Sequence, residues 1–341
     1  MAAFDLIQQY AQTALTRLPG PAQQLLQNPI AQKAAGVALA LGVLRSINNS
    51  LTQRALNNWV SSDPWNPSRE LILLTGGCSG IGKQVMEDLA RTGVRVIIFD
   101  ITEPKFKLPV NVSFYKVNIT NSESIAEVAK TIRSDHGEPT VLINNAGVGQ
   151  DGLILAKSEA TIRNTFEVNT ISHFLMVREF LPAMIRANHG HVVTLASMAS
   201  FVGLSEIADY CCTKASALAF HESLRQELRL YYKAPKVRTS IIHPWWVRTP
   251  MITLLTDYEK EFGQPIMTVQ TVSDAICSQI LNQNSGQVIL PASKTIARLL
   301  RGLPLWLQEF IRGKESQKLK VARDAQIRAE REAAERASKK S

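Results

Sequence analysis

The sequence TGGCSGIG at Thr75–Gly82 decides the fold of this chain. It directly follows the apolar run at 71–74 and precedes a segment with helical spacing of apolar residues. This order predicts a glycine-rich turn between a strand and a helix. Glycine suits such a turn when a pyrophosphate must approach the backbone, because a Cβ would block the approach, and the first amides of the helix would face the anion. We therefore expect a dinucleotide site, whose loop residues are Gly76, Ser79, Gly80, Ile81 and Gly82.

An aspartate ends the next apolar run. Asp100 closes the sequence VRVIIFD at 94–100. A carboxylate at this place can accept hydrogen bonds from the adenosine ribose, and it repels a 2′-phosphate. Ile101 and Thr102 follow it, and the glycine loop carries no Lys or Arg. We therefore expect NAD as cofactor, with NADP the less favoured alternative.

From residue 71 to residue 290, short apolar runs alternate with amphipathic ones. The strands are expected at 71–75, 94–99, 112–117, 140–143, 190–196, 237–242 and 287–290. The helices are expected at 81–91, 121–135, 160–187, 207–232 and 272–283. Strands separated by helices predict the α/β class with a single doubly wound parallel sheet.

Three residues downstream have a pattern that suits hydride chemistry. Tyr210 and Lys214 lie one helical turn apart on the same face, and Ser197 ends the expected strand 190–196. Reduction of a carbonyl needs a proton donor, and oxidation of an alcohol needs a base. A nearby ammonium and the positive charge of an oxidised nicotinamide favour the phenolate and lower the pKa of a tyrosine from its usual value of about 10. We expect Ser197 to hold the substrate oxygen beside the phenol.

Together with the NNAG sequence at Asn144–Gly147, these motifs resemble the short-chain dehydrogenase/reductase family over roughly residues 70–290. The resemblance implies a seven-stranded Rossmann-type sheet with helical extensions at both ends. It implies an NAD(P)-dependent oxidoreductase with Tyr210, Lys214 and Ser197 as catalytic residues. It also implies a fourth member, Asn169, which would hold a water that links the lysine to solvent.

The resemblance implies further cofactor contacts. Asn145 would support the cofactor side of the central strand, Lys214 would hydrogen-bond the nicotinamide ribose, and Thr249 would contact the cofactor near the nicotinamide. Asn118 stands where the family usually has an Asp near the adenine, and we expect its amide oxygen to accept a hydrogen bond from the adenine. Trp245 stands where the family usually has Gly. With Trp246, it would either line a lipid pocket or cap the sheet.

The apolar N-terminal segment, Asp100 and the HPWW sequence at 243–246 resemble membrane- or lipid-droplet-associated 17β-hydroxysteroid and retinol dehydrogenases. The Trp-containing linker expected at 61–69 and the KASALAFHE sequence at 214–222 resemble fungal members of that branch. This resemblance implies a lipophilic alcohol, aldehyde or ketone as substrate. The alternatives are a soluble carbonyl reductase of secondary metabolism and a cofactor-binding scaffold on a lipid surface. Members of the family usually pair through two long helices, so a homodimer is expected. The physiological direction and the identity of the substrate stay open.

The ends of the chain differ from the catalytic domain, which is expected at 70–293. Within 1–69, the apolar stretch 4–18 has nearly helical spacing, and the run at 30–44 is shorter than the roughly 20 residues of a spanning helix. This run would either pack on the catalytic domain of a cytoplasmic protein or anchor it in the endoplasmic reticulum or a lipid droplet, on the cytosolic face. Residues 294–341 comprise a basic amphipathic segment at 295–312 and a charged part that predicts a solvated helix or frayed tail.

The composition limits the remaining classes of function and binding partner. Hydrophobic residues make up 45% and charged residues 20%, as in folded globular proteins. The net charge of +9 suits an anionic partner, but no repeat or RNA-binding signature supports nucleic acid. The histidines lack metal-ligand spacing, so no metal is expected. The four cysteines show no disulfide framework, which indicates a reducing compartment.

Overall fold

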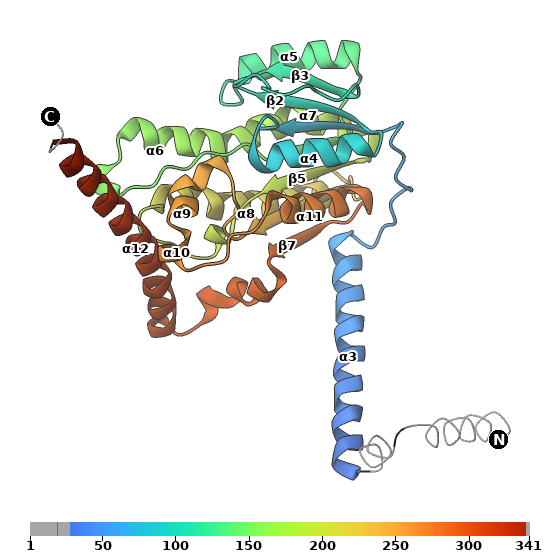
Figure 1. Ribbon diagram of the computed structural model, residues 1–341. Coiled ribbons are helices and arrows are strands. Elements are labelled where there is room, and N and C mark those ends of the chain that lie inside the picture. The colour runs from blue at the N-terminus through green and yellow to red at the C-terminus, as the bar shows by residue number, and fades with distance from the viewer. Residues whose placement is uncertain (1–18, 20–27, 339–341) are drawn as a thin grey trace. The chain divides into compact units, whose positions relative to one another are not determined.

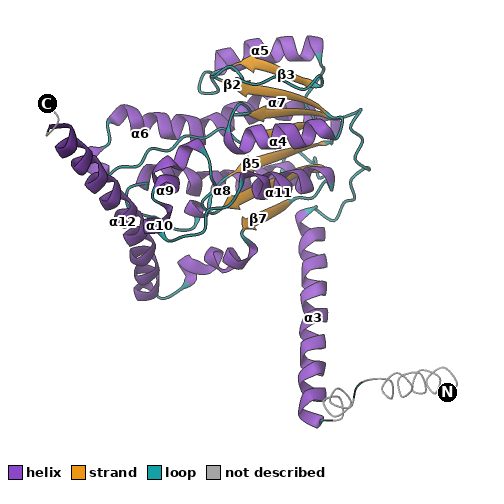
Figure 2. Ribbon diagram, in the orientation of Figure 1, coloured by secondary structure: helices purple, strands orange, loops and turns teal. Residues whose placement is uncertain are grey.

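A parallel sheet of seven strands forms the centre of the computed structural model, which describes residue 19 and residues 28–338 (Figures 1 and 2). The strands are β1 (Leu71–Thr75), β2 (Arg95–Asp100), β3 (Val112–Lys116), β4 (Val141–Asn144), β5 (Gly190–Leu195), β6 (Val237–Pro244) and β7 (Gly286–Leu290). Their order is β3-β2-β1-β4-β5-β6-β7, and every pairing is parallel. The predicted fold class is therefore confirmed. The order reverses between β1 and β4, where such sheets bind ligands at the carboxyl ends of the strands.

Helices precede the sheet, connect its strands and follow it in the chain. In the described residues they are α3 (Pro29–Leu56), α4 (Gly80–Arg91), α5 (Ser122–Asp135), α6 (Glu159–Phe166), α7 (Ser172–Ala187), α8 (Ala208–Leu230), α9 (Thr253–Asp257), α10 (Glu259–Phe262), α11 (Val269–Leu281) and α12 (Leu305–Ser338). Side chains of α5, α7 and α8 form one core with the sheet, and those of α4 and α11 form the other. All five residues of β1 are buried, as expected for a parallel strand covered on both faces.

The continuous helix expected at 160–187 is interrupted. A π-helical turn, Glu167–Ile171, lies between α6 and α7. Asn169 is in this turn and is fully buried. Single π turns inside α-helices are rare and occur mostly at functional sites, which periodicity of apolar residues cannot reveal.

The chain divides into two compact units, Met1–Ala55 and Leu56–Ser341. Residues 61–69, expected from the sequence to be a linker, belong to the second unit. Arg238, which is 2% exposed, donates hydrogen bonds to the carbonyls of Asn57 and Val60 and to the Ser62 hydroxyl, at 2.8, 2.6 and 2.8 Å. Segment 57–62 is thus fixed beside the amino-terminal end of β6.

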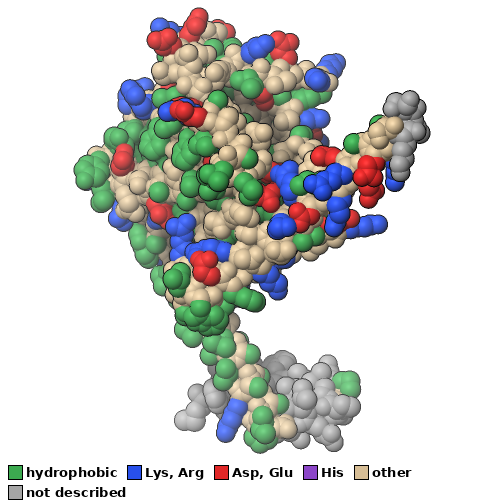
Figure 3. Space-filling view, turned by 90° about the vertical axis from the view of Figure 1, so that its left-hand side faces the viewer, with side chains coloured by type: hydrophobic (Ala, Val, Ile, Leu, Met, Phe, Trp, Pro, Cys, Tyr) green, Lys and Arg blue, Asp and Glu red, His purple; other side chains and the backbone are tan. Residues whose placement is uncertain are grey.

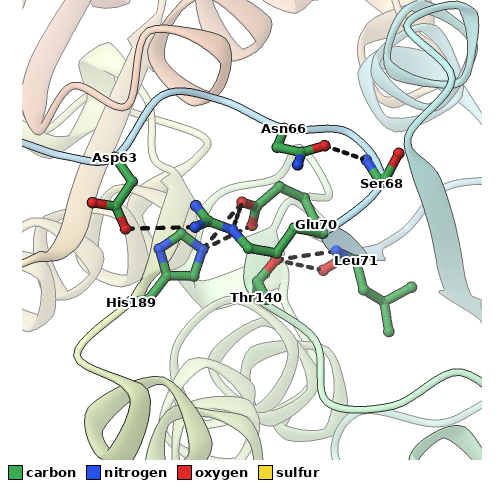
Figure 4. Close-up of polar contacts among 8 residues, drawn as sticks. Asp63, Asn66, Ser68, Glu70, Leu71, Thr140 and His189 are labelled. Carbon is green, nitrogen blue, oxygen red and sulfur yellow. Dashed lines mark hydrogen bonds and ion pairs between the residues drawn. The ribbon is translucent and has the colours of Figure 1, made fainter.

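A second polar cluster fixes the start of β1 (Figure 4). The buried Glu70 carboxylate contacts His189 Nε2 at 3.0 Å and accepts a hydrogen bond from Arg69 Nε at 3.0 Å. Burial raises the pKa of Glu70, but hydrogen bonds, chiefly from His189, outweigh it and leave the pKa below its usual value. Asp63 also pairs with Arg69, so the segment before β1 is held by charge at two points.

Helix α3 is longer than the apolar run that indicated it. It extends from Pro29 to Leu56, 28 residues, and its length and composition are sufficient to cross a membrane. The helix is longer than the apolar run because it continues through the polar residues after Leu44, and whether the segment spans, lies on or avoids a membrane stays open. The apolar stretch predicted at 4–18 lies outside the described residues.

The C-terminal segments form two helices separated at Pro304. A 3₁₀-helical stretch covers Ala292–Gly302, and α12 follows. The interpretation of residues after Lys314 as wholly solvated was wrong, because Leu319, Ala322 and Ala325 of α12 are buried. Residues 339–341 lie outside the described part of the chain.

Candidate active site

One cavity of about 690 Å³ opens at the carboxyl ends of the strands. It is lined by every residue that the sequence singled out, with the exception of Asn169. These residues are Gly76, Ser79, Gly80, Ile81, Gly82, Asp100, Asn118, Asn145, Ser197, Tyr210, Lys214 and Thr249. The structure thus brings together residues that end or follow the six strands β1 to β6 and residues of the helices α4 and α8.

The glycine loop is tightly packed behind the cavity. A Cβ on Gly82 would lie 2.0 Å from the Gly76 carbonyl oxygen, so no other residue fits there. Asn145 Nδ2 donates to the carbonyls of Thr75 and Gly76 at 2.9 and 3.0 Å and ties the loop to β4. Ser79 precedes α4 in extended conformation, and its side chain makes no capping hydrogen bond among the described residues. The first amides of α4 therefore face the cavity with a free hydroxyl beside them, which fits a pyrophosphate.

The Asp100 carboxylate is fixed by two backbone amides. Its oxygens accept hydrogen bonds from the amides of Cys78 and Thr102, both at 3.0 Å. The side chain thus orders the glycine loop in addition to facing the adenosine end of the cavity. Asn118 Oδ1 accepts hydrogen bonds from the Thr120 amide at 3.1 Å and from its hydroxyl at 2.9 Å. The amide oxygen expected to receive an adenine hydrogen bond is therefore already engaged within its own loop.

The phenol of Tyr210 lies beside the Ser197 hydroxyl. Burial raises the pKa of Tyr210 to about 12, and the hydrogen bond with Ser197 lowers it only partly. The Lys214 ammonium lies 5.4 Å from the centre of the tyrosine ring. Burial thus dominates the pKa of this phenol, and the lowering expected from Lys214 together with the positive charge of the oxidised nicotinamide stays a prediction. Ser197 itself is positioned by its carbonyl, which contacts His243 Nδ1 at 3.0 Å.

Lys214 and Asn169 lie behind the phenol. Lys214 Nζ donates to the Leu195 carbonyl at 2.8 Å, and burial lowers its pKa to about 8. The Asn169 carboxamide accepts from the Val148 amide and donates to the Val148 carbonyl, both at 2.8 Å, and it also donates to Thr213 Oγ1 at 3.1 Å. The π turn therefore directs Asn169 to the loop after β4, where its carboxamide hydrogen-bonds both backbone polar groups of Val148.

The remaining wall of the cavity is largely apolar. It is formed by Val148, Met198, Val202, Leu204, Ile207, Trp245, Trp246, Met251 and Ile252. Both tryptophans line the cavity, and Trp246 also packs edge-on against Phe262 at 5.4 Å between ring centres. Sequence reasoning missed His243 as a support of Ser197 and Asp151 as a polar group in this wall. No local motif marks either residue, because their neighbours come from distant segments.

Comparison with known proteins agrees with this geometry. The family model of short chain dehydrogenases matches residues 70–260, which is more than half of the chain. The chain belongs to this family. Dehydrogenase RED2 of Cochliobolus heterostrophus is 41% identical to this short-chain dehydrogenase over 208 residues, 60% of this chain and 77% of the relative. Estradiol 17-beta-dehydrogenase 11 of Macaca fascicularis is 36% identical over 191 residues, 54% of this chain and 63% of the relative.

Solved structures agree with the fold. 4-hydroxyisoleucine dehydrogenase complexed with NADH superposes with a TM-score of 0.58 at 21% identity, covering 65% of this chain and 96% of that one. At this identity the likeness establishes the fold alone. The curated relatives confirm the resemblance to the fungal and 17β-hydroxysteroid branch of the family. The short-chain dehydrogenase is thus an oxidoreductase of a family that uses nicotinamide cofactors.

Proposed function

We propose that this short-chain dehydrogenase interconverts a lipophilic alcohol and its aldehyde or ketone with NAD, using Tyr210, Ser197, Lys214 and Asn169. The observation that carries the proposal is the meeting of Ser197 and Tyr210 on the wall of the cavity that the glycine loop also lines. The loop would hold the pyrophosphate, and when bound the nicotinamide supplies the hydride donor or acceptor. Complete catalytic and cofactor groups argue against a scaffold without turnover.

Ser197 and Tyr210 would hold the substrate oxygen from two sides. The Ser197 hydroxyl accepts a hydrogen bond from the Ala199 amide at 3.2 Å, which orients its proton away from that amide. It can therefore donate to a carbonyl oxygen. The raised pKa keeps the Tyr210 phenol protonated in the cofactor-free protein, ready to protonate that oxygen during reduction. In oxidation the phenol would accept the alcohol proton, with the positive charges of Lys214 and the oxidised cofactor favouring the phenolate.

Lys214 would act on the tyrosine through the nicotinamide ribose. Its ammonium is anchored on the Leu195 carbonyl, which leaves two protons to donate. The lowered pKa makes proton exchange near neutral pH accessible. Asn169 would position the loop at Val148 and the water expected between Lys214 and solvent, as the family resemblance implies.

Asp100 supports NAD over NADP. Its carboxylate would receive the ribose hydroxyls and repel a 2′-phosphate. Titration of the purified protein with NADH and NADPH, followed by nicotinamide fluorescence, tests this assignment. Tighter binding of NADH is expected. Tighter binding of NADPH would assign the protein to carbonyl reduction with NADP, and binding of neither would favour the scaffold alternative.

The apolar wall and the exposed helices support a lipophilic substrate at a membrane or lipid-droplet surface. Every side chain of α3 is at least partly exposed, with Leu39 71% and Leu41 61% exposed. Exposed apolar side chains also occur around Pro304, namely Ile296, Leu299, Leu305, Trp306 and Phe310. In Figure 3 hydrophobic side chains gather on the face that α12 crosses, with Lys and Arg side chains beside them. Such a mixture suits the interface of an anionic bilayer on the cytosolic face of the endoplasmic reticulum or a lipid droplet.

Flotation of the full chain with phosphatidylcholine–phosphatidylserine vesicles tests the anchor. We expect the protein to float, and the double variant Leu39→Lys, Leu41→Lys to remain at the bottom of the gradient. The matched control Asn48→Lys, Asn49→Lys adds the same charge to the polar part of α3 and should still float. Complete recovery of the unaltered chain in the soluble fraction would contradict the anchor and favour a soluble reductase.

A homodimer is proposed on the basis of the family resemblance and of exposed apolar side chains at the junction of α6 and α7. Phe166, Ile171 and Phe174 are 37%, 41% and 48% exposed there. In sedimentation-velocity measurements, Ile171→Lys should convert dimers to monomers, whereas Val110→Lys on an exposed loop should not. A monomeric unaltered chain would contradict this assignment.

A further inference from the structure

The helix that carries Tyr210 starts without a side-chain cap. Tyr210 is the third residue of α8, which begins at Ala208. Ile207 precedes the helix and has no polar side-chain atom that could accept hydrogen bonds from the first amides. The proposed reaction nevertheless requires the phenol to stay within hydrogen-bond distance of the substrate oxygen. Other contacts must therefore fix this end of α8.

A buried ion pair lies beside Tyr210 in the chain. The Lys157 ammonium pairs with the Asp209 carboxylate of α8, and both side chains are 5% exposed. Thr165 Oγ1 of α6 lies 3.2 Å from the second carboxylate oxygen. The negative charge in the first turn of α8 also interacts favourably with the helix dipole. Asp209 thus joins the start of α8 to α6 and to the segment that carries Lys157.

Lys157 also contacts the loop that lies beside the tyrosine ring. It follows the short 3₁₀ turn Ile154–Ala156, at the end of the loop after β4. A Cβ on Gly149 would lie 3.2 Å from Cδ2 of Tyr210, so the backbone of this loop is close to the ring. A Cβ on Gly152 would lie 3.6 Å from Cγ and from Cε of Lys157, so the lysine side chain lies along the same loop. The lysine thus contacts the loop beside the ring and, through its ion pair, the helix that carries the ring.

Stability alone is a poor explanation of this pair. Transfer of two charges out of water is costly, and apolar side chains of similar volume often stabilise a protein equally well or better. Apolar contacts are also non-directional, whereas a charge-assisted hydrogen bond fixes its two partners in distance and angle. A buried pair at this place is therefore better suited to fixing the direction of α8 than to adding stability.

We infer that Lys157 and Asp209 are positioning residues for Tyr210, which hold the start of α8 so that the phenol faces the substrate oxygen beside Ser197. Neither residue lines the cavity, so both act through the helix and the loop and not by contact with the substrate. The inference rests on the proposed function, and it names two further residues on which the reaction at the same site depends.

The first test reports the environment of Tyr210 without any substrate. The full chain is labelled with 3-fluorotyrosine, and the ¹⁹F resonance of Tyr210 is assigned by its loss in Tyr210→Phe. The double variant Lys157→Met, Asp209→Leu replaces the pair with apolar side chains and avoids leaving one of its charges buried alone. We expect the Tyr210 resonance to shift or broaden in this variant. A resonance of unchanged position and width overturns the inference.

The matched control is another ion pair that joins two helices. Arg133 of α5 contacts Glu179 of α7 at 2.6 Å, and neither residue lines the cavity. The double variant Arg133→Met, Glu179→Leu should lower Tm but leave the Tyr210 resonance and turnover unaltered. A control that changes the Tyr210 resonance to the same extent would indicate a general loss of structure and would also overturn the inference.

Steady-state kinetics separates this inference from the proposed function, with straight-chain methyl ketones and NADH as the probes. In Lys157→Met, Asp209→Leu, kcat should fall by about 100-fold, the effect of a small misplacement of a reacting group. KM and NADH affinity should change little, because the cavity wall and the glycine loop are untouched. A changed Tyr210 resonance without turnover of any ketone by the unaltered chain would contradict the proposed function and support the positioning of Tyr210. Turnover with an unaltered kcat, or a change confined to KM, would overturn the positioning role alone.

Discussion

The cofactor half and the substrate half of the cavity are built in different ways. The cofactor half comes from three strand ends close in the sequence, and its contacts are backbone amides and carbonyls around Gly76, Asp100 and Asn145. The substrate half combines the loop at 148–151, the segment at 198–207, the segment at 245–252 and the support of α12. Short motifs, each local in the sequence, therefore indicate the cofactor site, whereas the substrate depends on side chains that only the tertiary structure brings together.

The largest effect on activity is expected at Tyr210, which lies where the cofactor half and the substrate half of the cavity meet. Tyr210→Phe removes the proton-transfer group and should lower kcat by about 10²- to 10⁴-fold. NADH affinity should remain unchanged in a fluorescence titration, since the phenol lies outside the glycine loop. Undiminished turnover in the NADH assay would show that another group transfers the proton.

A pair of glycines tests the contrast directly. Gly82→Ala would place a Cβ 2.0 Å from the Gly76 carbonyl oxygen and should destabilise the protein by about 3 kcal/mol, with loss of NADH binding. Gly203 lies in the substrate half, and its Cβ would meet no atom within 4 Å. We expect Gly203→Ala to match the unaltered chain in denaturant unfolding. Equal effects of the two substitutions would contradict the view that only the cofactor half is sterically closed.

Burial of the Lys214 ammonium destabilises the folded protein, and the size of this effect depends on pH. Its pKa is lowered from 10.5 to about 8, so between these values the unfolded chain binds more protons, and the free energy of unfolding rises with pH. Lys214→Met should remove this rise and stabilise the protein at pH 7 by about 3 kcal/mol, while activity is lost. Thermal unfolding of both proteins from pH 7 to about pH 10 measures the difference, which should shrink as the pH increases. A Lys214→Met variant less stable at pH 7 would contradict this cost.

The smallest expected effect is a change in cofactor preference, which tests whether the cofactor half and the substrate half act independently. Asp100→Asn removes the charge and, because its amide nitrogen cannot accept, one of the two backbone hydrogen bonds from Cys78 and Thr102. Both cofactors should therefore bind more weakly, but NADPH should gain about tenfold in affinity relative to NADH, equivalent to about 1.4 kcal/mol. Trp246→Ala should change KM for a lipophilic ketone substrate and leave the affinities for NADH and NADPH unaltered. A shift in cofactor preference in Trp246→Ala would show that the halves are coupled.

Local sequence patterns were sufficient to predict the fold and the residues of the cofactor half. The run Leu71–Thr75, the glycines and Asp100 act through neighbours in the sequence, so periodicity and spacing located them. The π turn at Asn169 was not predictable, because its energy is offset by tertiary hydrogen bonds to Val148 and Thr213. Likewise, nothing near Arg238 in the sequence indicates that it binds the segment at 57–62.

The sequence also could not predict how burial and neighbouring charges together set the pKa of a side chain. The spacing of Tyr210 and Lys214 indicated a lowered phenol pKa, but the depth of the site sets the opposite direction in the cofactor-free protein. Asp151 and Arg323 are far apart in the sequence, and only the packing of α12 on the cavity wall brings them together.

The π turn also has an evolutionary consequence. Such a turn is an α-helix that accommodates one additional residue, so loss of a single codon, for example that of Thr170, would restore regular winding. Each residue of an α-helix turns by about 100°, so the deletion would rotate every side chain on one side of the gap relative to the other. Asn169 would then leave Val148, although no reading frame is broken and the helix would remain intact. This helix should therefore tolerate many substitutions in its descendants but no change in length.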